Sequence, residues 1–271
     1  MSTETIRATD NPALANKLAA EATSNVEVAV PAPKVVIPLP PDTTVTLPAG
    51  LLDPFEGLIT TAEIRELNGA DEEAISKLND QGKVLLSILE RATVKIGDKE
   101  ATKEDLDSLL AGDREALLLA IRIATFGKDI TLAPQCPHCG EMQKFEVDLE
   151  KDVEMKMLAD EDRSFTIDCK IGKVVASLPT GSTQKALINA TNKNAAELDT
   201  ILLKGCIESI NGTPVMNLQQ IRDLGLKDRR ELVKAITDRN PGPQLSDIKK
   251  NCESCDKEVA LPLTLADLFR E

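Results

Sequence analysis

Two short cysteine motifs decide how this chain folds: "PQCPHCG" at residues 134–140 and "NCESCDK" at residues 251–257. Both have the spacing Cys-x-x-Cys, and together they hold four of the six cysteines. Zinc binds four thiolates at the corners of a tetrahedron, and one Cys-x-x-Cys turn supplies two of them. We therefore predict one structural zinc ion per chain. The predicted ligands are Cys136, Cys139, Cys252 and Cys255.

The two motifs lie far apart in the chain, because residues 140–251 separate Cys139 from Cys252. This separation is much longer than in a compact zinc ribbon, so we expect the metal to join the end of one half of the chain to the end of the other. A cross-link between distant segments restricts the unfolded chain most. Four thiolates leave no open position for a water molecule, so the predicted site is structural rather than catalytic.

A redox dithiol, two disulfides and an iron–sulfur cluster are the alternatives to zinc. A redox Cys-x-x-Cys normally begins a helix, whereas "CPHCGEMQKFEV" (136–147) continues into an alternating, strand-like sequence. The first thirty residues have no apolar core typical of a secretory signal. We therefore expect a reducing host cytoplasm as the place of synthesis, where close cysteine pairs more often bind metal than form disulfides. These arguments favour zinc.

The other thiols and the histidine are expected to play no part in the site. His138 lies inside the first motif and is an alternative ligand, but we expect an exposed turn residue. Cys169 lies in a predicted strand and Cys206 in a predicted helix, where a free cysteine usually behaves as a small apolar core residue.

The composition argues against several classes of function. Lys and Arg total 32 against 45 for Asp and Glu, and the net charge of −13 repels nucleic acid and anionic membranes. No run of eighteen apolar residues predicts a membrane-spanning helix. With no Trp or Tyr, the chain lacks most of the aromatic groups that stack on bases or sugars. A single histidine leaves almost no residues for acid–base catalysis, so we expect no enzyme.

The chain divides into three predicted parts. Residues 1–42 end in "PAPKVVIPLPPD" (31–42), whose five prolines predict an extended N-terminal arm. Residues 43–150 form a first half that ends with the first cysteine motif, and residues 151–271 form a second half that ends with the second.

Periodicity predicts the elements within these halves. Residues 43–52 alternate as a strand that stops at Pro and Gly, and apolar spacing predicts helix from Thr60 to Phe126 with Gly127 as the stop. Residues 163–181 predict two strands around a turn. Helical spacing returns from Ser182 to Asp238.

The second half resembles the first in sequence. "LNGADEEA" (67–74) parallels "LPTGSTQKA" (178–186), with a Gly five residues before the final Ala in each. The segment at residues 96–121 parallels residues 210–236, since each carries Asp-Arg and then Ala-Ile. Aligned spacing of this kind indicates internal duplication. We predict an α+β fold of two pseudo-repeated halves, with helices and short antiparallel strands, joined by a four-cysteine site like that of a zinc ribbon.

The repeated Asp-Arg pairs are interpreted as structural. Asp113 and Asp228 each precede a helical segment and are expected to be N-caps, with Glu231 completing a capping box with Asp228. Arg114 and Arg229 are expected to bridge to a carboxylate within the fold or on a neighbouring chain.

Three stretches together carry a resemblance to a known family: residues 47–75, "LLAGDREALLLAIRIATFGKDI" (109–130) and "CPHCGEMQKFEVDL" (136–149). They resemble the baseplate protein family of T-even-like contractile-tailed phages. The resemblance covers residues 38–150 well and the second half more loosely, and it is most specific in Gly112-Asp113-Arg114, Ile121–Gly127 and the first cysteine motif.

This resemblance implies a baseplate component without catalytic activity, found in the virion. We expect a structural adaptor that contacts other baseplate or tail proteins through its N-terminal arm and helical faces, in several copies within a symmetric assembly. An assembly chaperone that is absent from the mature virion is the first alternative. A zinc-ribbon module associated with nucleic acid is a second, which predicts a strip of basic residues beside the cysteines.

Overall fold

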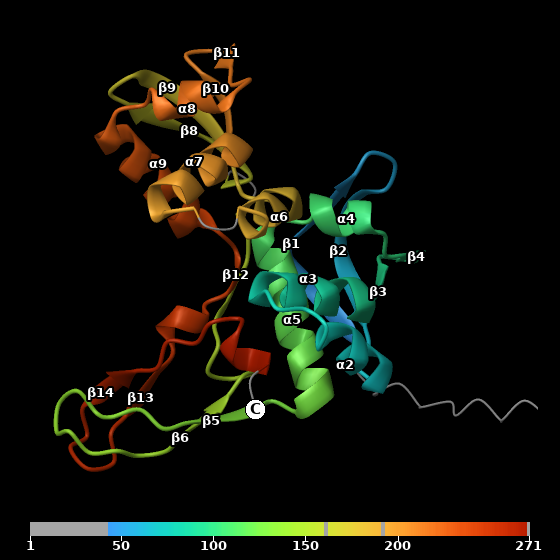
Figure 1. The fold of residues 1–271 in the computed structure, drawn as a ribbon, viewed down its shortest axis with the longest axis vertical. Coiled ribbons are helices and arrows are strands. Elements are labelled where there is room, and N and C mark those ends of the chain that lie inside the picture. The colour runs from blue at the N-terminus through green and yellow to red at the C-terminus, as the bar shows by residue number, and fades with distance from the viewer. Residues whose placement is uncertain (1–42, 160–161, 191–192, 270–271) are drawn as a thin grey trace, which may run out of the picture. The chain divides into compact units, whose positions relative to one another are not determined.

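The computed structural model describes residues 43–159, 162–190 and 193–269, which all lie in one compact unit, Leu39–Glu271. Helices and short antiparallel sheets alternate along the chain, so the predicted α+β class is confirmed (Figure 1). The predicted N-terminal arm, residues 1–42, lies outside the described residues. In the part of the chain that is described, no helix has both the length and the apolar character needed to cross a membrane.

The first half is built on a four-stranded antiparallel sheet with strand order β1-β2-β3-β4. Helices α2 and α3 connect β2 to β3, and helices α4 and α5 follow β4. Apolar residues of β1, β2, α3 and α5 form one core. The bounds are β1 Thr44–Asp53, β2 Gly57–Ile64, α2 Gly69–Ile75, α3 Gln81–Ala92, β3 Thr93–Ile96, β4 Lys99–Glu100, α4 Lys103–Ser108 and α5 Ala111–Phe126.

The second half contains a sheet with the corresponding order, β8-β9-β10-β11. Helices α6 and α7 connect β9 to β10, and α8 and α9 follow β11, so helices occur at the same points as in the first half. A second core lies among these elements. The bounds are β8 Ser164–Cys169, β9 Gly172–Ser177, α6 Gly181–Ile188, α7 Ala195–Cys206, β10 Ile207–Ile210, β11 Thr213–Pro214, α8 Leu218–Arg222 and α9 Leu226–Arg239.

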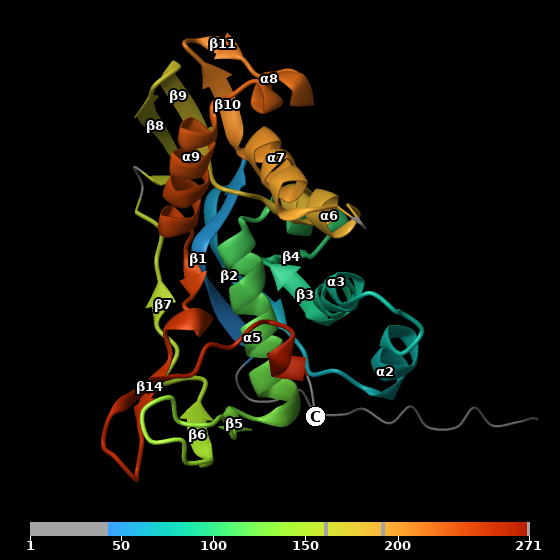
Figure 2. The ribbon, with the colours of Figure 1, turned by 60° about the vertical axis from the view of Figure 1, so that its left-hand side comes forward.

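The last part of each half forms a small hairpin, and the two hairpins lie side by side (Figures 1 and 2). Strands β5 and β6 make the first, β13 and β14 the second, and the bonded pair β7 and β12 lies between them in sequence. A third apolar core includes residues of both hairpins and η2. The bounds are β5 Asp129–Leu132, β6 Phe145–Asp148, β7 Met155–Lys156, β12 Gly242–Pro243, η2 Leu245–Asp247, β13 Lys249–Asn251, β14 Glu258–Ala260 and η3 Asp267–Phe269.

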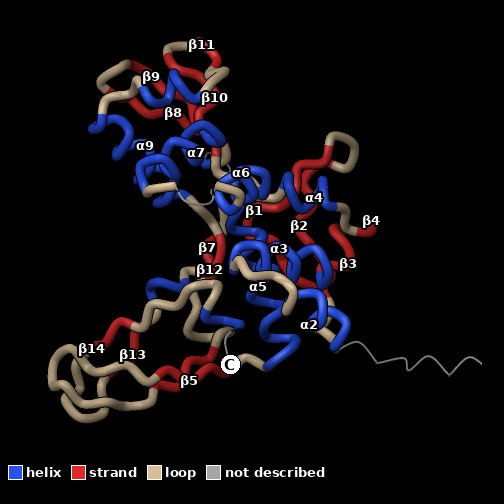
Figure 3. The backbone as a smooth tube through the Cα atoms, viewed as in Figure 1, coloured by secondary structure: helices blue, strands red, loops and turns tan. Residues whose placement is uncertain are grey.

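Two long helical predictions are wrong where strands interrupt them (Figure 3). Residues 60–64 belong to β2, in which Ala62 and Ile64 are buried on one face of the sheet. Strands β3 and β10 interrupt the two predicted helical regions immediately after α3 and α7. Each strand has only four residues, so the helical spacing of the longer segments around it dominates the sequence pattern.

Other boundaries follow turn chemistry. Strand β1 does not stop at Pro48 and Gly50, because its pairing with β2 shifts register between Thr46 and Leu51, and a bulge tolerates both residues. Helix α5 ends at Gly127 as predicted, where a φ of 86° suits glycine. The predicted hairpin of β8 and β9 is confirmed.

Candidate metal centre

The four predicted zinc ligands come together between the two small hairpins. The Sγ atoms of Cys136 and Cys255 are 3.8 Å apart, those of Cys139 and Cys252 are 3.7 Å apart, and all four lie within 4.8 Å of one another. Sulfurs placed about 2.3 Å from a zinc ion at tetrahedral corners are about 3.8 Å apart. The donor set and its spacing therefore fit a tetrahedral metal ion.

The two cysteine turns share one backbone conformation. The N–H of Cys136 donates to the carbonyl of Glu141, and the N–H of Gly140 donates to the carbonyl of Cys136. In the second turn, Cys252 donates to Lys257 and Asp256 donates to Cys252 in the same pattern. The residue after the second cysteine of each turn is left-handed, with φ of 79° at Gly140 and 54° at Asp256. Each turn therefore presents two thiols in one direction.

The thiols influence one another's ionisation. Burial alone raises the pKa of Cys136, but the backbone N–H groups of His138 and Cys139 and the neighbouring thiols lower it to about 6. The N–H of Glu141 lowers the pKa of Cys139, yet burial and the three neighbouring thiols outweigh it and raise that pKa to about 12. The cluster therefore favours a thiolate at Cys136 and opposes ionisation of Cys139 until a cation neutralises the charge.

Groups around the sulfurs hold the second turn in place. The side-chain Oε1 of Gln143 lies 3.4 Å from the Cys252 thiol and accepts the Glu253 N–H at 3.2 Å. Cys136 and Cys252 are buried in the third core, whereas Cys139 is exposed. The exposed His138 lies outside the sulfur cluster, and its ring Nε2 is 3.1 Å from the Glu258 carbonyl, so it bridges the two hairpins.

The remaining thiols lie in the second core, as predicted. Cys206 is buried there, and burial raises its pKa to about 12. Cys169 packs against the same core and lies within 4.8 Å of ligand atoms on Asp228 and Glu231. Both oxygens of Asp228 already accept backbone N–H groups, from Lys170 and Ile171 at 3.0 Å each. These bonds give Asp228 a structural role.

The predicted N-cap role of the repeated aspartates is wrong. Asp113 and Asp228 each stand at the third position of their helices, whose N-caps are Leu110 and Gly225 without a side-chain capping bond. Asp113 instead accepts the N–H groups of two β1 residues, Ala49 at 2.7 Å and Gly50 at 3.2 Å. Each carboxylate therefore fastens a helix to backbone from a different element. The predicted capping box with Glu231 is absent for the same reason.

The two arginines make matching contacts. Arg114 Nη1 donates to the Leu106 carbonyl at 2.6 Å, and Arg229 Nη1 donates to the Ile221 carbonyl at 3.1 Å, eight residues earlier in each case. Arg114 also lies 3.8 Å from Asp107, so its predicted carboxylate partner is present. Among the described residues, Arg229 donates to carbonyl and hydroxyl oxygens, so the expected carboxylate partner within the fold is not found there.

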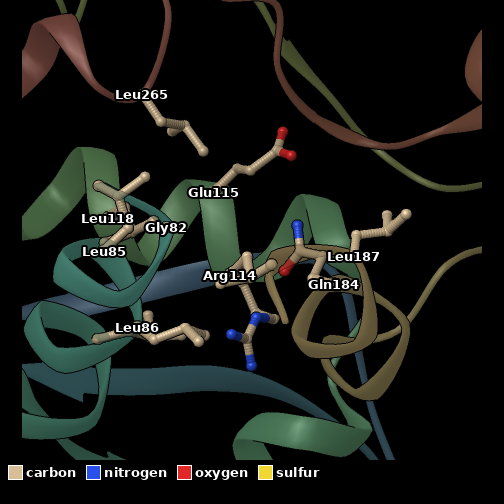
Figure 4. Close-up of a pocket in the computed structure, with 11 residues that line it drawn as sticks. Gly82, Leu85, Leu86, Arg114, Glu115, Leu118, Gln184, Leu187 and Leu265 are labelled. Atoms are coloured by element: carbon tan, nitrogen blue, oxygen red, sulfur yellow. The ribbon is translucent and has the colours of Figure 1, made fainter. Parts of the chain in front are cut away.

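A cleft of about 250 Å³ lies between α3, α5 and α6, and Leu265 also lines it (Figure 4). Its lining is mostly aliphatic, and Arg114 and Glu115 extend from α5 to opposite sides. Burial raises the pKa of Glu115 to about 7 from 4.5, and in the described part of the chain no hydrogen bond or ion pair involves its carboxylate. The ionised Glu115 carboxylate therefore lowers the free energy of unfolding.

Replacing Glu115 with Gln is expected to stabilise the fold in alkaline solution. Because its folded pKa is raised, the folded state holds the proton between pH 4.5 and 7, so Glu115 lowers stability as pH rises through this window. Allowing for partial exposure, the gain is about 1–2 kcal/mol above pH 7 and vanishes below pH 4.5. Thermal unfolding below pH 4.5 and above pH 7 measures this gain in stability. The control is Glu146→Gln, at an exposed position. A gain that does not depend on pH would contradict the assignment.

Comparison with known proteins identifies a family. The model of the T4 bacteriophage base plate protein family matches residues 41–270, nearly the whole chain. No curated protein and no solved structure matches the chain. The match includes both halves and all four clustered cysteines. The chain therefore belongs to the T4 bacteriophage base plate protein family.

Proposed function

We propose that this protein is a structural subunit of a contractile phage tail baseplate, an adaptor that docks neighbouring baseplate proteins and has no catalytic activity. The family match over residues 41–270 is the observation that supports this most. The proposal places the protein in the virion tail after synthesis in the host cytoplasm. Its four-thiol cluster suits a role in which rigidity matters more than chemistry.

Cys136, Cys139, Cys252 and Cys255 would hold one zinc ion per chain. Four thiolates and sulfur spacings of 3.7–3.8 Å across two pairs support zinc over a disulfide, whose sulfurs are about 2.05 Å apart. The bound ion would join β5–β6 to β13–β14 and so connect the ends of the two halves. Its chemistry there would be structural, because the thiolates fill all four positions.

Internal duplication is the best account of the two halves. Their sheets have the same strand order, with a helix pair at the same two points. The arginines of the two Asp-Arg pairs make equivalent contacts, and each half ends in a cysteine turn with the same hydrogen-bond pattern. These agreements involve sequence, topology and hydrogen bonding, and they support descent from one repeated unit.

Docking to neighbours would use the N-terminal arm, residues 1–42, and exposed apolar groups of the folded part. The strongest such group is the tip between β1 and β2, where Phe55 is 95% exposed beside Leu52 and Leu58. Asp53 accepts the N–H groups of Phe55 and Glu56, which fixes the turn. An exposed aromatic side chain on a hydrogen-bonded turn is typical of the residues enriched in protein interfaces.

The nucleic-acid alternative loses support from the charges near the cysteines. Lys249 pairs with Glu258 at 2.9 Å, and Lys250 pairs with Asp152 at 2.5 Å. A lysine held by a carboxylate is less available to a phosphate, and the net charge of −13 opposes the approach of nucleic acid.

Mass spectrometry of purified virions separates a built-in subunit from an assembly chaperone. A subunit is expected in intact particles at a fixed ratio to other tail proteins, including after a high-salt wash. Detection in infected-cell lysate but not in virions would favour the chaperone and overturn the adaptor role. A known virion protein and a known non-virion phage protein serve as the two controls.

A further inference from the structure

The two halves meet in a short antiparallel pairing between the start of α5 and the start of α6 (Figure 1). Leu110 and Thr180 are partners in an isolated β-bridge. The N–H of Ala111 donates to the Pro179 carbonyl at 2.8 Å, and the N–H of Gly181 donates to the Leu109 carbonyl at 2.9 Å. The backbone at the start of α5 in the first half therefore binds the backbone at the start of α6 in the second half.

The pairing requires a glycine. A Cβ atom at Gly181 would overlap Arg114 Nη1 and the Leu106 carbonyl oxygen. These two atoms are themselves hydrogen-bonded to each other, so the position offers little room to adjust. The contact between Arg114 and Leu106 in the first half therefore leaves room only for a glycine at position 181 of the second half.

The receiving surface, which is Leu109–Ala111 in the first half, recurs in the second half at Leu224–Leu226, where no described residue is bound to it. Gly225, the N-cap of α9, has φ −61° and ψ 146°, close to the φ −65° and ψ 154° of Leu110. Arg229 donates to Ile221 as Arg114 does to Leu106. Within the described residues, neither the Leu226 N–H nor the Leu224 carbonyl has a hydrogen-bond partner, and the Leu226 side chain is 74% exposed.

The inserting surface, which is Pro179–Gly181 in the second half, recurs in the first half at Leu67–Gly69, where it likewise has no partner among the described residues. Asn68, the N-cap of α2, has φ −125° and ψ 176°, an extended conformation like that of Thr180 at φ −99° and ψ 174°. The Leu67 carbonyl and the Gly69 N–H make no hydrogen bond with any described residue. Their spacing repeats that of the Pro179 carbonyl and the Gly181 N–H.

No described residue of the chain explains Gly69. It is the first residue of α2, its φ is not left-handed, and a Cβ atom there would meet no described residue within 4 Å. Glycine weakens a helix relative to alanine, so an open position with a helical backbone favours another residue. A neighbour that occupies this space would give Gly69 the same role that Gly181 has.

We propose that a second copy of this chain docks head to tail, with its Leu67–Gly69 segment paired with Leu224–Leu226. The Leu226 N–H would donate to the Leu67 carbonyl, and the Gly69 N–H would donate to the Leu224 carbonyl. A hollow of about 580 Å³, which Leu67, Gly69 and Phe126 help to line, gives room for the exposed Leu226 side chain.

The inference rests on the duplication and the baseplate role proposed above, and on the expectation that several copies of the chain occur in one assembly. Because the two docking surfaces differ, the contact is heterologous and each added copy leaves one surface of each kind free. Such contacts build a ring if the rotation closes and an open chain if it does not. Contacts of this kind suit a subunit that occurs in several copies around a tail axis.

Two substitutions remove one surface each without weakening the helix that carries it. Gly69→Ala fills the space that Arg229 of the neighbour needs and favours α2. Leu226→Pro removes the donated N–H at the first position of α9, where proline is well tolerated, and the extended Gly225 before it accepts a following proline. Gln81→Ala and Gln81→Pro, at the first position of α3, are the matched controls.

Sedimentation velocity of the full chain over a concentration series tests the proposal. The wild type and both controls are expected to self-associate, and each variant is expected to do so at least about tenfold more weakly, with a melting temperature that is unchanged or higher. A one-to-one mixture of Gly69→Ala and Leu226→Pro is expected to form dimers and nothing larger, because one intact surface remains on each chain.

Three results would overturn this contact. They are a wild type that stays monomeric at every concentration, a Gly69→Ala variant that associates normally, and a mixture of the two variants that stays monomeric. None of them would affect the baseplate assignment, which virion composition tests, or the zinc site, which metal analysis tests.

Discussion

The Cys252→Ser, Cys255→Ser double variant is expected to lose its metal and about 4 kcal/mol of folding free energy. This is the stabilisation given by a ligand present at about a thousand times its Kd. The two thiols contribute half of the sulfur cluster, and Cys252 is also buried in the third core. Removing them releases β13–β14 from β5–β6, which are far apart in sequence, so the unfolded chain gains freedom. Thermal unfolding measures the loss.

A chelator provides the matched control for this experiment. It is expected to lower the melting temperature of the wild type to that of the double variant and to leave the double variant unchanged. Cys169→Ala, at a thiol outside the cluster, is expected to retain zinc and to respond to chelator as the wild type does. An unchanged melting temperature in the double variant, with zinc still bound, would contradict the bridging role.

Asp113→Ala is expected to destabilise the fold by about 2–4 kcal/mol, since it leaves two buried backbone donors without an acceptor. Asp113 is fully buried, and Ala49 and Gly50 on β1 donate to its Oδ1. The substitution therefore detaches β1 from the start of α5. Urea unfolding measures the change, and Asp113→Asn, which keeps an acceptor oxygen, is expected to cost less.

Asp228→Ala is the internal comparison, because Asp228 occupies the corresponding helix position in the second half. Its donors, the N–H groups of Lys170 and Ile171, belong to exposed residues in the turn between β8 and β9, where water can replace the lost carboxylate. The expected loss is about 1 kcal/mol. Equal losses at the two aspartates, or a larger one at Asp228, would contradict this account.

The cysteine cluster was predictable because its geometry is local. A Cys-x-x-Cys turn fixes two sulfurs by its own backbone, and tetrahedral coordination dictates that two turns meet. Gln143 beside Cys252 was not predictable, since a glutamine in an alternating sequence carries no signal for a thiol placed by another hairpin. The unpaired Glu115 was equally hidden, because its environment depends on how α3, α5 and α6 pack.

The aspartates show why helix starts were misplaced. An Asp at the N-cap and an Asp at the third helical position both favour a helix start, so sequence alone leaves the boundary uncertain by a few residues. Asp113 is used to hold β1, and its helix begins two residues earlier, at Ala111. Strands β3 and β10 were missed because each follows its helix without a break and is paired along one edge by a strand that precedes the helix pair.

Metal analysis of the purified full chain tests the central claim most directly. Elemental analysis gives the ratio of zinc to protein, and thiol titration in denaturant, with and without chelator, counts the cysteines that the metal protects. The account predicts one zinc per chain and four thiols released by the chelator, at Cys136, Cys139, Cys252 and Cys255. Absence of metal together with fewer titratable thiols than the six cysteines of the chain would contradict it.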